Sequence, residues 1–71
     1  MKYLHFTGWA KASTSLAVLV EISGNTTEWF PISQCRFHKD LYSEGDQVEV
    51  DVPEWLAIEK GIDHEAEFEC D

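Results

Sequence analysis

The sequence predicts a small, mainly β domain: a five-stranded barrel with one short helix before the last strand. The chain has 71 residues, which is enough for a single domain and only a small core. An apolar fraction of 44% with three Trp, two Tyr and four Phe indicates a folded chain and not a disordered one. Turn-forming Gly, Pro, Asn and Asp recur at spacings that suit short strands. We therefore treat residues 1–71 as one β domain.

Three strands are expected in the first half of the chain. Residues 2–11 alternate imperfectly between apolar and polar side chains, and residues 13–22 are apolar and β-branched, which is typical of a central strand. The Ser-Gly-Asn-Thr sequence at 23–26 predicts a hairpin turn, because Gly and Asn accept positive φ at low cost. Residues 28–38 then form the returning strand, in which Pro31 marks an edge or a bulge.

The second half predicts a loop, a strand, a helix and a last strand. Residues 40–46 are polar, and residues 47–52 alternate cleanly. Residues 53–61 read as a short helix, with Pro at its start and Gly at its end, that packs on the barrel through Trp55, Ile58 and Leu56. Residues 64–71 form the last strand or an ordered tail. This plan matches an SH3-like barrel, and an OB-like barrel is the nearest alternative.

Acidic residues are concentrated in the last part of the chain, which carries most of the net charge of −9. Residues 44–71 hold eleven acids and one base, Lys60. In residues 47–52 and 65–71, apolar residues alternate with mainly acidic ones, so each segment buries one face and presents carboxylates from the other. The predicted partner-binding carboxylates are those of Glu49, Asp51, Glu65, Glu67, Glu69 and Asp71.

This charge indicates what kind of partner the protein binds. Phosphate binding depends on Lys and Arg, of which the chain has five, so we expect no direct contact with nucleic acid or an anionic membrane. A partner protein with a basic surface is the better match. The longest apolar run, residues 16–20, is too short to span a membrane, and no secretory signal is evident, so we expect a cytoplasmic (host-cell) location.

No catalytic motif is present, and we expect neither an enzyme nor a cofactor. The carboxylates are expected on a solvated face, whereas a carboxyl that acts as a general acid needs burial to raise its pKa. Cys35, His38, His64 and Cys70 have the ligand types of a zinc site, but strand geometry directs them apart, so no metal site is expected. The two cysteines are expected to be reduced, buried thiols and not a disulfide.

The tryptophans offer a second contact surface. Trp9, Trp29 and Trp55 could form an aromatic platform, although packing in the core is the favoured interpretation in so small a domain. Trp29 and Phe30 are the exception. Because neighbouring strand residues face opposite ways, one of them is expected outside the main core, and both are candidate partner-binding residues.

Two local patterns suggest a relationship. Residues 29–34, Trp-Phe-Pro-Ile-Ser-Gln, resemble a Trp-x-Pro-x-Ser motif, and residues 53–61 resemble a Pro-Glu-Trp-Leu-Ala-x-x-Lys-Gly ending. Together they resemble small uncharacterised accessory proteins of bacteriophages and prophages, over residues 17–62. Such proteins often have a basic residue just before the motif serine, where this chain has Ile32, and they end near the point where its acidic residues 63–71 begin. The resemblance implies a phage accessory setting and no activity.

The leading hypothesis from the sequence is a non-enzymatic phage-type accessory protein that binds a host protein through its acidic face. Alternate strand residues lie about 6.6 Å apart, on the scale of the phosphate step in nucleic acid. In its most concrete form the protein is a nucleic-acid-mimicking inhibitor of a defence or nucleic-acid-processing complex. The alternative is a structural or scaffold module of a phage assembly that uses Trp29, Phe30 and Trp55. Acidity that serves only solubility stays open as a third interpretation.

Overall fold

Six strands form one antiparallel sheet in the computed structural model, which describes residues 1–71. The mainly β prediction is confirmed, but the strands number six and not five, because the predicted strand 28–38 divides after Pro31. In chain order the elements are β1 (Tyr3–Ser13), β2 (Ala17–Ser23), β3 (Thr26–Pro31), β4 (Arg36–Phe37), β5 (Gln47–Pro53), the α-helix α1 (Glu54–Glu59), the 3-10 helix η1 (Asp63–Glu65) and β6 (Phe68–Cys70).

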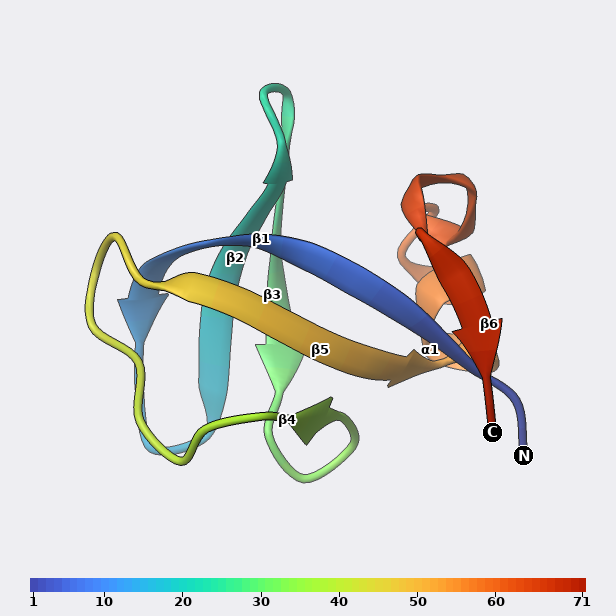
Figure 1. Cartoon of the computed structure of the whole chain (residues 1–71), viewed down its shortest axis with the longest axis horizontal. Helices are drawn as coiled ribbons and strands as arrows, with labels where there is room; N and C mark the ends of the chain where they lie inside the picture. Colours follow the sequence, from blue (N-terminus) through green and yellow to red (C-terminus); the bar gives the residue numbers. More distant parts are fainter.

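β1 is the centre of the sheet, whose order is β3-β2-β1-β5-β4 with β6 also paired to β1. β5 pairs with β1 from Tyr3 to Trp9, whereas β6 pairs from Tyr3 to His5 and β2 from Trp9 to Ser13. A strand has two edges, so β2 and β6 share the edge of β1 that β5 does not occupy. Figure 1 shows β6 beside the start of β1, with the two chain ends close together.

The sheet is not closed, so the structure does not show the closed barrel that the sequence predicts. β3 pairs only with β2, and β4 pairs only with β5. Pro31 ends β3, as expected for a residue without a backbone N–H, and β4 is only two residues long. The strands at the two ends of the sheet therefore form no ladder with each other.

The core lies on one face of the strongly curved sheet. Alternation places Leu4 and Phe6 of β1 on the same side as Val48, Val50 and Val52 of β5, and all five are buried. β2 and β3 add further buried side chains to this face, and the segments after the strands complete it. The remaining buried apolar residues are Ala10, Val18, Val20, Phe30, Cys35, Tyr42, Leu56, Ala57 and Ile62.

Helix α1 begins and ends close to where the sequence predicts. Gly61 has φ of +74°, the left-handed conformation that a glycine cap provides. The N–H of Gly61 donates to Ile58 O at 3.0 Å and that of Ile62 to Ala57 O at 3.0 Å, which is a Schellman ending. The predicted packing of the helix is wrong in part: Leu56 is buried as expected, whereas Trp55 and Ile58 are exposed. No helix in the structure has the length and apolarity needed to cross a membrane.

The C-terminal segment differs most from its prediction. The regular strand expected over residues 64–71 is replaced by η1 and by a strand of only three residues, β6. Glu65 therefore belongs to a 3-10 helix, and the even row of carboxylates predicted from Glu65 to Asp71 does not form. Main-chain pairing explains the position of β6: its residues pair with the start of β1, and the N–H of Glu67 donates to His5 O at 2.8 Å.

Candidate protein-binding surface

The face of the sheet opposite the core carries the polar side chains of β1 and β5. We call this the outer face and define it by His5, Thr7, Glu49, Asp51 and Phe68. His5 is the register partner of Asp51 in β5 and of Phe68 in β6, so the three side chains lie on the same side of the sheet. The cleanest amphipathic prediction, the strand at 47–52, therefore places Glu49 and Asp51 as expected.

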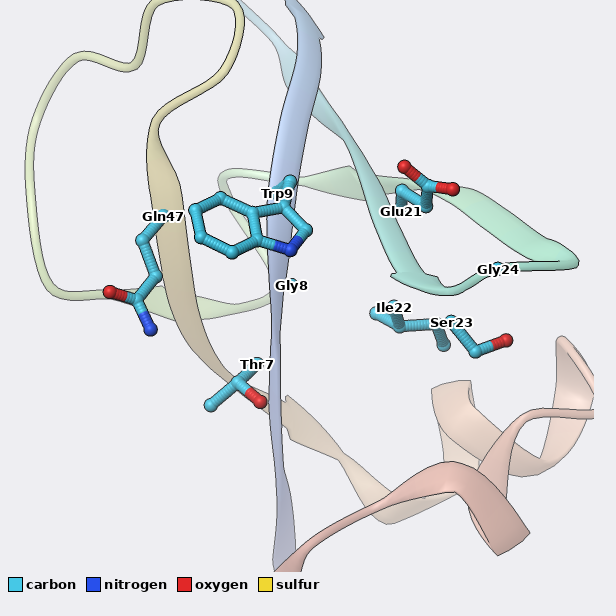
Figure 2. A pocket seen from close by; sticks show the side chains of 8 residues that line it. All are labelled: Thr7, Gly8, Trp9, Glu21, Ile22, Ser23, Gly24 and Gln47. Atoms are coloured by element: carbon cyan, nitrogen blue, oxygen red, sulfur yellow. The ribbon is translucent and has the colours of Figure 1, made fainter.

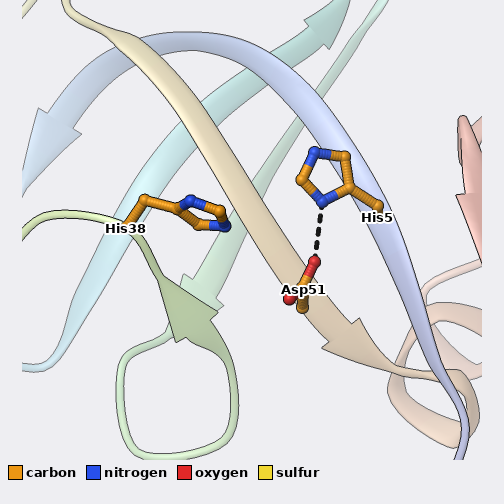
Figure 3. Close-up of side chains that lie close together, drawn as sticks. All are labelled: His5, His38 and Asp51. Carbon is orange, nitrogen blue, oxygen red and sulfur yellow. Dashed lines mark hydrogen bonds and ion pairs between the residues drawn. The ribbon is translucent and has the colours of Figure 1, made fainter. Parts of the chain in front are cut away.

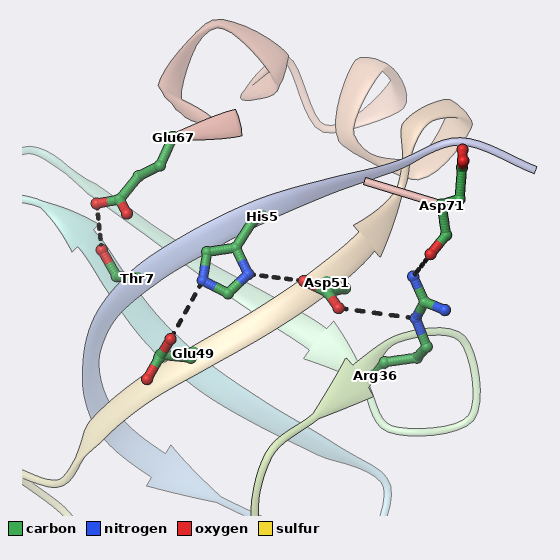
Figure 4. A network of polar contacts seen from close by, with 7 residues as sticks. All are labelled: His5, Thr7, Arg36, Glu49, Asp51, Glu67 and Asp71. Carbon is green, nitrogen blue, oxygen red and sulfur yellow. Dashed lines mark hydrogen bonds and ion pairs between the residues drawn. The ribbon is translucent and has the colours of Figure 1, made fainter. Parts of the chain in front are cut away.

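His5 is the centre of the outer face and is only 5% exposed. Its Nδ1 lies 2.7 Å from Asp51 Oδ1, and its Nε2 lies 3.4 Å from Glu49 Oε1. The ring of Phe68 stacks on the imidazole, with 4.5 Å between ring centroids and 11° between planes. Asp51 hydrogen-bonds one edge of the ring, Glu49 lies near the other edge, and Phe68 covers one flat side, so the ring is buried and no buried side-chain N or O atom lacks a partner. Figure 4 shows His5 between the carboxylates of Glu49 and Asp51.

Arg36 fixes the other side of Asp51. Its guanidinium lies over the ring of Tyr3, 3.7 Å from the centroid, and its Nε is 3.8 Å from Asp51 Oδ2. The same side chain donates from Nη2 to the main-chain O of Asp71 at 2.9 Å (Figure 4). Asp51 is thus held between an imidazole and a guanidinium, and its side chain is only 18% exposed. It is available to a partner far less than the sequence predicts.

The other predicted carboxylates are divided between several surfaces. Glu49 and Glu67 are exposed on the outer face, where Thr7 Oγ1 donates to Glu67 Oε2 at 2.6 Å. Glu69 is the register partner of Leu4, so it lies toward the core side of the sheet and pairs with Lys2 at 3.1 Å. Glu65 accepts a hydrogen bond from Thr26 at 3.2 Å. The structure brings together part of the predicted set, and the two acidic rows are not continuous.

Trp29 and Phe30 lie on opposite faces of β3, as strand alternation predicts. Phe30 is the register partner of Val18 and is 0% exposed, so its assignment as a partner-binding residue is wrong. Trp29 is 43% exposed and can make such a contact. Trp9 and Trp55 are also exposed, by 54% and 49%, so the expectation that the tryptophans pack in the core is wrong too.

A recess of about 420 Å³ lies beside Trp9, where β2 diverges from β1 (Figure 2). Its lining is mainly polar and comes from β1, β2, the turn after β2 and the start of β5. The indole of Trp9 is the group in it that would attract a cationic side chain, whereas the carboxylate of Glu21 is already paired with Lys11 at 3.7 Å. This recess has no signal in the sequence, because it depends on where two paired strands separate. Its residues are Thr7, Gly8, Trp9, Glu21, Ile22, Ser23, Gly24 and Gln47.

All five Lys and Arg side chains are paired with carboxylates, at N–O distances between 3.1 and 3.8 Å. Six of the 14 acidic side chains take part in these pairs, which leaves eight without a Lys or Arg partner. Five of the eight lie within residues 59–71. The eight are Asp40, Glu44, Glu49, Glu59, Asp63, Glu65, Glu67 and Asp71.

Both cysteines are free thiols. Cys35 is buried in the core, and desolvation raises the pKa of its thiol to about 12, with the positive charge of Lys60 opposing the shift. Cys70 is only partly buried, against the prediction, and its pKa is raised by desolvation and by the negative charge of Asp51. The zinc-type set considered from the sequence does not converge, because Cys35 belongs to the core and His64 is exposed on η1.

The buried thiol leads to a prediction about alkylation. With a pKa near 12 instead of 9.0, the thiolate fraction of Cys35 at pH 8 falls by about a thousandfold. We expect Cys35, in a Cys70→Ser variant, to react with iodoacetamide at least about 100-fold more slowly in the folded protein than in urea. Mass spectrometry of timed samples measures both rates. Equal rates in the two conditions would contradict the buried position of Cys35.

No protein-family model, no curated protein and no solved structure matches this chain. We therefore infer the function from the geometry and charge of the chain itself.

Proposed function

We propose that the protein is a non-enzymatic binding protein that docks on a basic surface of a partner protein through the outer face. The observation that carries this proposal is the pairing of charges. Every Lys and Arg is already neutralised by a neighbouring carboxylate, whereas eight acidic side chains have no such partner. A surface of this kind attracts cationic partners over a distance and repels phosphates.

The outer face combines these free charges with an apolar anchor. Phe68 is 54% exposed, and the exposed carboxylates of Glu49 and Glu67 lie on the same face. Protein interfaces commonly have an aromatic centre within a polar rim, and electrostatic complementarity sets their association rate and specificity. We infer that Phe68 is the apolar centre and that the two carboxylates lie beside it in the rim.

In its most concrete form, the partner is a nucleic-acid-processing or defence complex of a host cell, whose basic channel the acidic face occupies. The phage-type accessory setting of this proposal comes from the resemblance of residues 29–34 and 53–61 to phage and prophage proteins. The structure modifies the mimicry argument, because Asp51 and Glu69 are paired internally and are not free to imitate phosphates. In this proposal, the predicted carboxylates that contact the basic channel are those of Glu49, Glu67 and Asp71.

A scaffold module is the second candidate. Its support is the exposure of two large aromatic side chains, Trp29 by 43% and Trp55 by 49%. In that case the contact would be apolar and would persist in high salt, whereas a contact driven by carboxylates weakens as screening increases.

Charge reversal on the outer face tests the leading proposal. The bait variants are Glu49→Lys with Glu67→Lys, and a control with the same change in net charge, Glu44→Lys with Glu59→Lys, away from the outer face. In pull-downs from nuclease-treated bacterial lysate, we expect wild type and control to capture the same protein at about 50 mM salt and to release it at about 500 mM. Capture by the outer-face variant should fall at least about tenfold.

The outcomes separate the candidates. Equal loss in both double variants would contradict a localised docking face and indicate only a general effect of net charge. Capture that persists at high salt and disappears with Trp29→Ala would favour the scaffold module. Thermal melts of each bait establish that the variants are folded, which matters because Glu49 also pairs with His5.

A further inference from the structure

Three metal-ligating side chains from separate segments converge on the outer face. They are His5 of β1, Asp51 of β5 and His38, the residue after β4. One donor atom from each lies within 4.8 Å of the other two. Figure 3 shows the two imidazoles and the carboxylate directed toward one another. Strand pairing produces this arrangement, because Asp51 is the register partner of both His5 and Arg36, and His38 follows Arg36 by two residues.

The orientation of His5 is that of a metal ligand supported by a second carboxylate. Its Nδ1 is directed at Asp51, whereas its Nε2 lies 3.4 Å from Glu49 Oε1. Histidines that bind metal ions usually donate their other ring N–H to a carboxylate, which fixes the tautomer and the ring orientation. Glu49 is the carboxylate on that side of the ring and would accept this bond after a small movement of its side chain, and stacking by Phe68 holds the ring in place.

His38 has no other role in the polar network. It takes part in no hydrogen bond or ion pair, and its ring lies edge-on to that of His5, with 5.9 Å between centroids and 74° between planes. His38 is exposed, so a metal ion can reach the cluster from solvent. A metal site needs a path by which the ion can enter. His38 provides this path, because it is exposed and has a free ring nitrogen beside the carboxylate-bound His5.

The donor set determines which ions fit. Two imidazole nitrogens and one carboxylate oxygen suit Zn²⁺ and similar transition-metal ions, whereas Mg²⁺ and Ca²⁺ prefer oxygen ligands alone. Bonds of about 2.0–2.1 Å in tetrahedral geometry place neighbouring donors about 3.3 Å apart. The 2.7 Å between His5 Nδ1 and Asp51 Oδ1 must therefore open slightly, and the widest separation of up to 4.8 Å must close. Exposed His38 can supply the closing movement.

We propose that His5, His38 and Asp51 form a three-ligand site for a zinc-type divalent metal ion, with Glu49 as the outer partner of His5. The fourth coordination position faces solvent. Arg36 opposes the ion through its proximity to Asp51 Oδ2, but the net charge of −9 favours a cation overall. This inference does not depend on the proposed docking function, since it concerns the chain alone.

Metal titration of untagged, EDTA-treated full-length protein tests the site. We expect one Zn²⁺ per chain by calorimetry and, with Co²⁺, the intense visible absorption of a tetrahedral complex. His38→Ala, and separately His38→Gln, should weaken Zn²⁺ binding at least tenfold, because each removes one of three ligands. His64→Ala is the matched control: it removes another exposed histidine, outside the cluster, and should leave affinity unchanged. Zn²⁺ should raise the Tm of wild type and of His64→Ala more than that of the His38 variants.

Several results would overturn the proposal. One is the absence of one-to-one Zn²⁺ binding by wild type at micromolar concentrations. Another is unchanged affinity in both His38 variants, and a third is loss of binding in His64→Ala. Melts in EDTA establish that each variant is folded, so a loss of binding can be assigned to the missing ligand.

Discussion

Replacing Phe30 by alanine is expected to lower the free energy of unfolding by about 3–5 kcal/mol, because a fully buried phenyl ring is removed from the core. Phe30 is 0% exposed and lies opposite Val18 in the ladder, and its ring centroid is 6.1 Å from that of Phe6. At about 0.05–0.15 kcal/mol per residue, a chain of 71 residues has a total stability of about 4–11 kcal/mol. The substitution therefore removes a large share of it, and the variant is expected to be close to unfolding.

Urea denaturation followed by fluorescence or circular dichroism measures the change as a shift of the midpoint. Trp29→Ala is the matched control, since it truncates a larger side chain at the preceding residue of the same strand. Trp29 is 43% exposed, so we expect it to cost about 1 kcal/mol or less. A Trp29→Ala variant that is less stable than Phe30→Ala would contradict the orientation of β3.

This pair of variants also bears on function. The sequence assigned both Trp29 and Phe30 to partner binding, yet only one of two neighbouring strand residues can face outward. Loss of binding in Phe30→Ala would reflect loss of the fold, whereas loss in Trp29→Ala would reflect a contact. Stability must therefore be measured before either variant is used to test the scaffold module.

The elements that could be predicted from the sequence are those with strong local patterns. The alternation of residues 47–52 predicted β5 and the outward direction of Glu49 and Asp51, although only Glu49 is exposed. Pro53 and Gly61 predicted where α1 begins and ends, with Pro53 as the residue just before the helix. In both cases the decisive physics lies within a few residues: side-chain period in a strand, and backbone conformation at a helix end. The hairpin at residues 23–26 also forms where it was predicted, but neither Gly24 nor Asn25 has the positive φ on which that prediction was based.

The C-terminal segment could not be predicted because its conformation is decided by contacts far away in the sequence. Residues 65–71 alternate as well as residues 47–52 do, but only Phe68–Cys70 finds a free edge of β1. The burial of His5 depends on the same event, since Phe68 stacks on its ring. His5 alternates with Leu4 and Phe6, which places it on the outer face but does not indicate that β6 covers it.

The metal-type cluster was missed for a related reason. The candidate ligands in the sequence were Cys35, His38, His64 and Cys70, and strand geometry correctly separated them. The set that converges contains only His38 from that group, joined by His5 and Asp51 through the register of β1, β5 and β4. Register between distant strands is set by the whole sheet and by turn geometry, so local spacing cannot identify such a set.

Replacing Gly8 by alanine is expected to cost about 3 kcal/mol, near the upper end for overpacking, because the added methyl group meets main-chain atoms. A Cβ at this position would lie 2.2 Å from Glu21 O and 2.9 Å from Val20 Cγ1. A side chain can rotate out of the way, but the carbonyl of Glu21 belongs to β2 and cannot move without disturbing its ladder with β1 and β3. Strand separation or local unfolding near Gly8 must follow.

Urea denaturation again provides the measurement, and Gly24→Ala is the matched control. A Cβ at Gly24 meets no atom within 4 Å, so we expect a change within about 0.5 kcal/mol there. Equal stability of the two alanine variants would contradict the close approach of β1 to β2. Gly8 and Gly24 both line the recess beside Trp9, but only at Gly8 does the neighbouring strand come too close to admit a Cβ. Gly8→Ala should therefore widen the recess at its base, whereas Gly24→Ala leaves its shape intact, and the chemical-shift changes around the Trp9 indole should follow that difference.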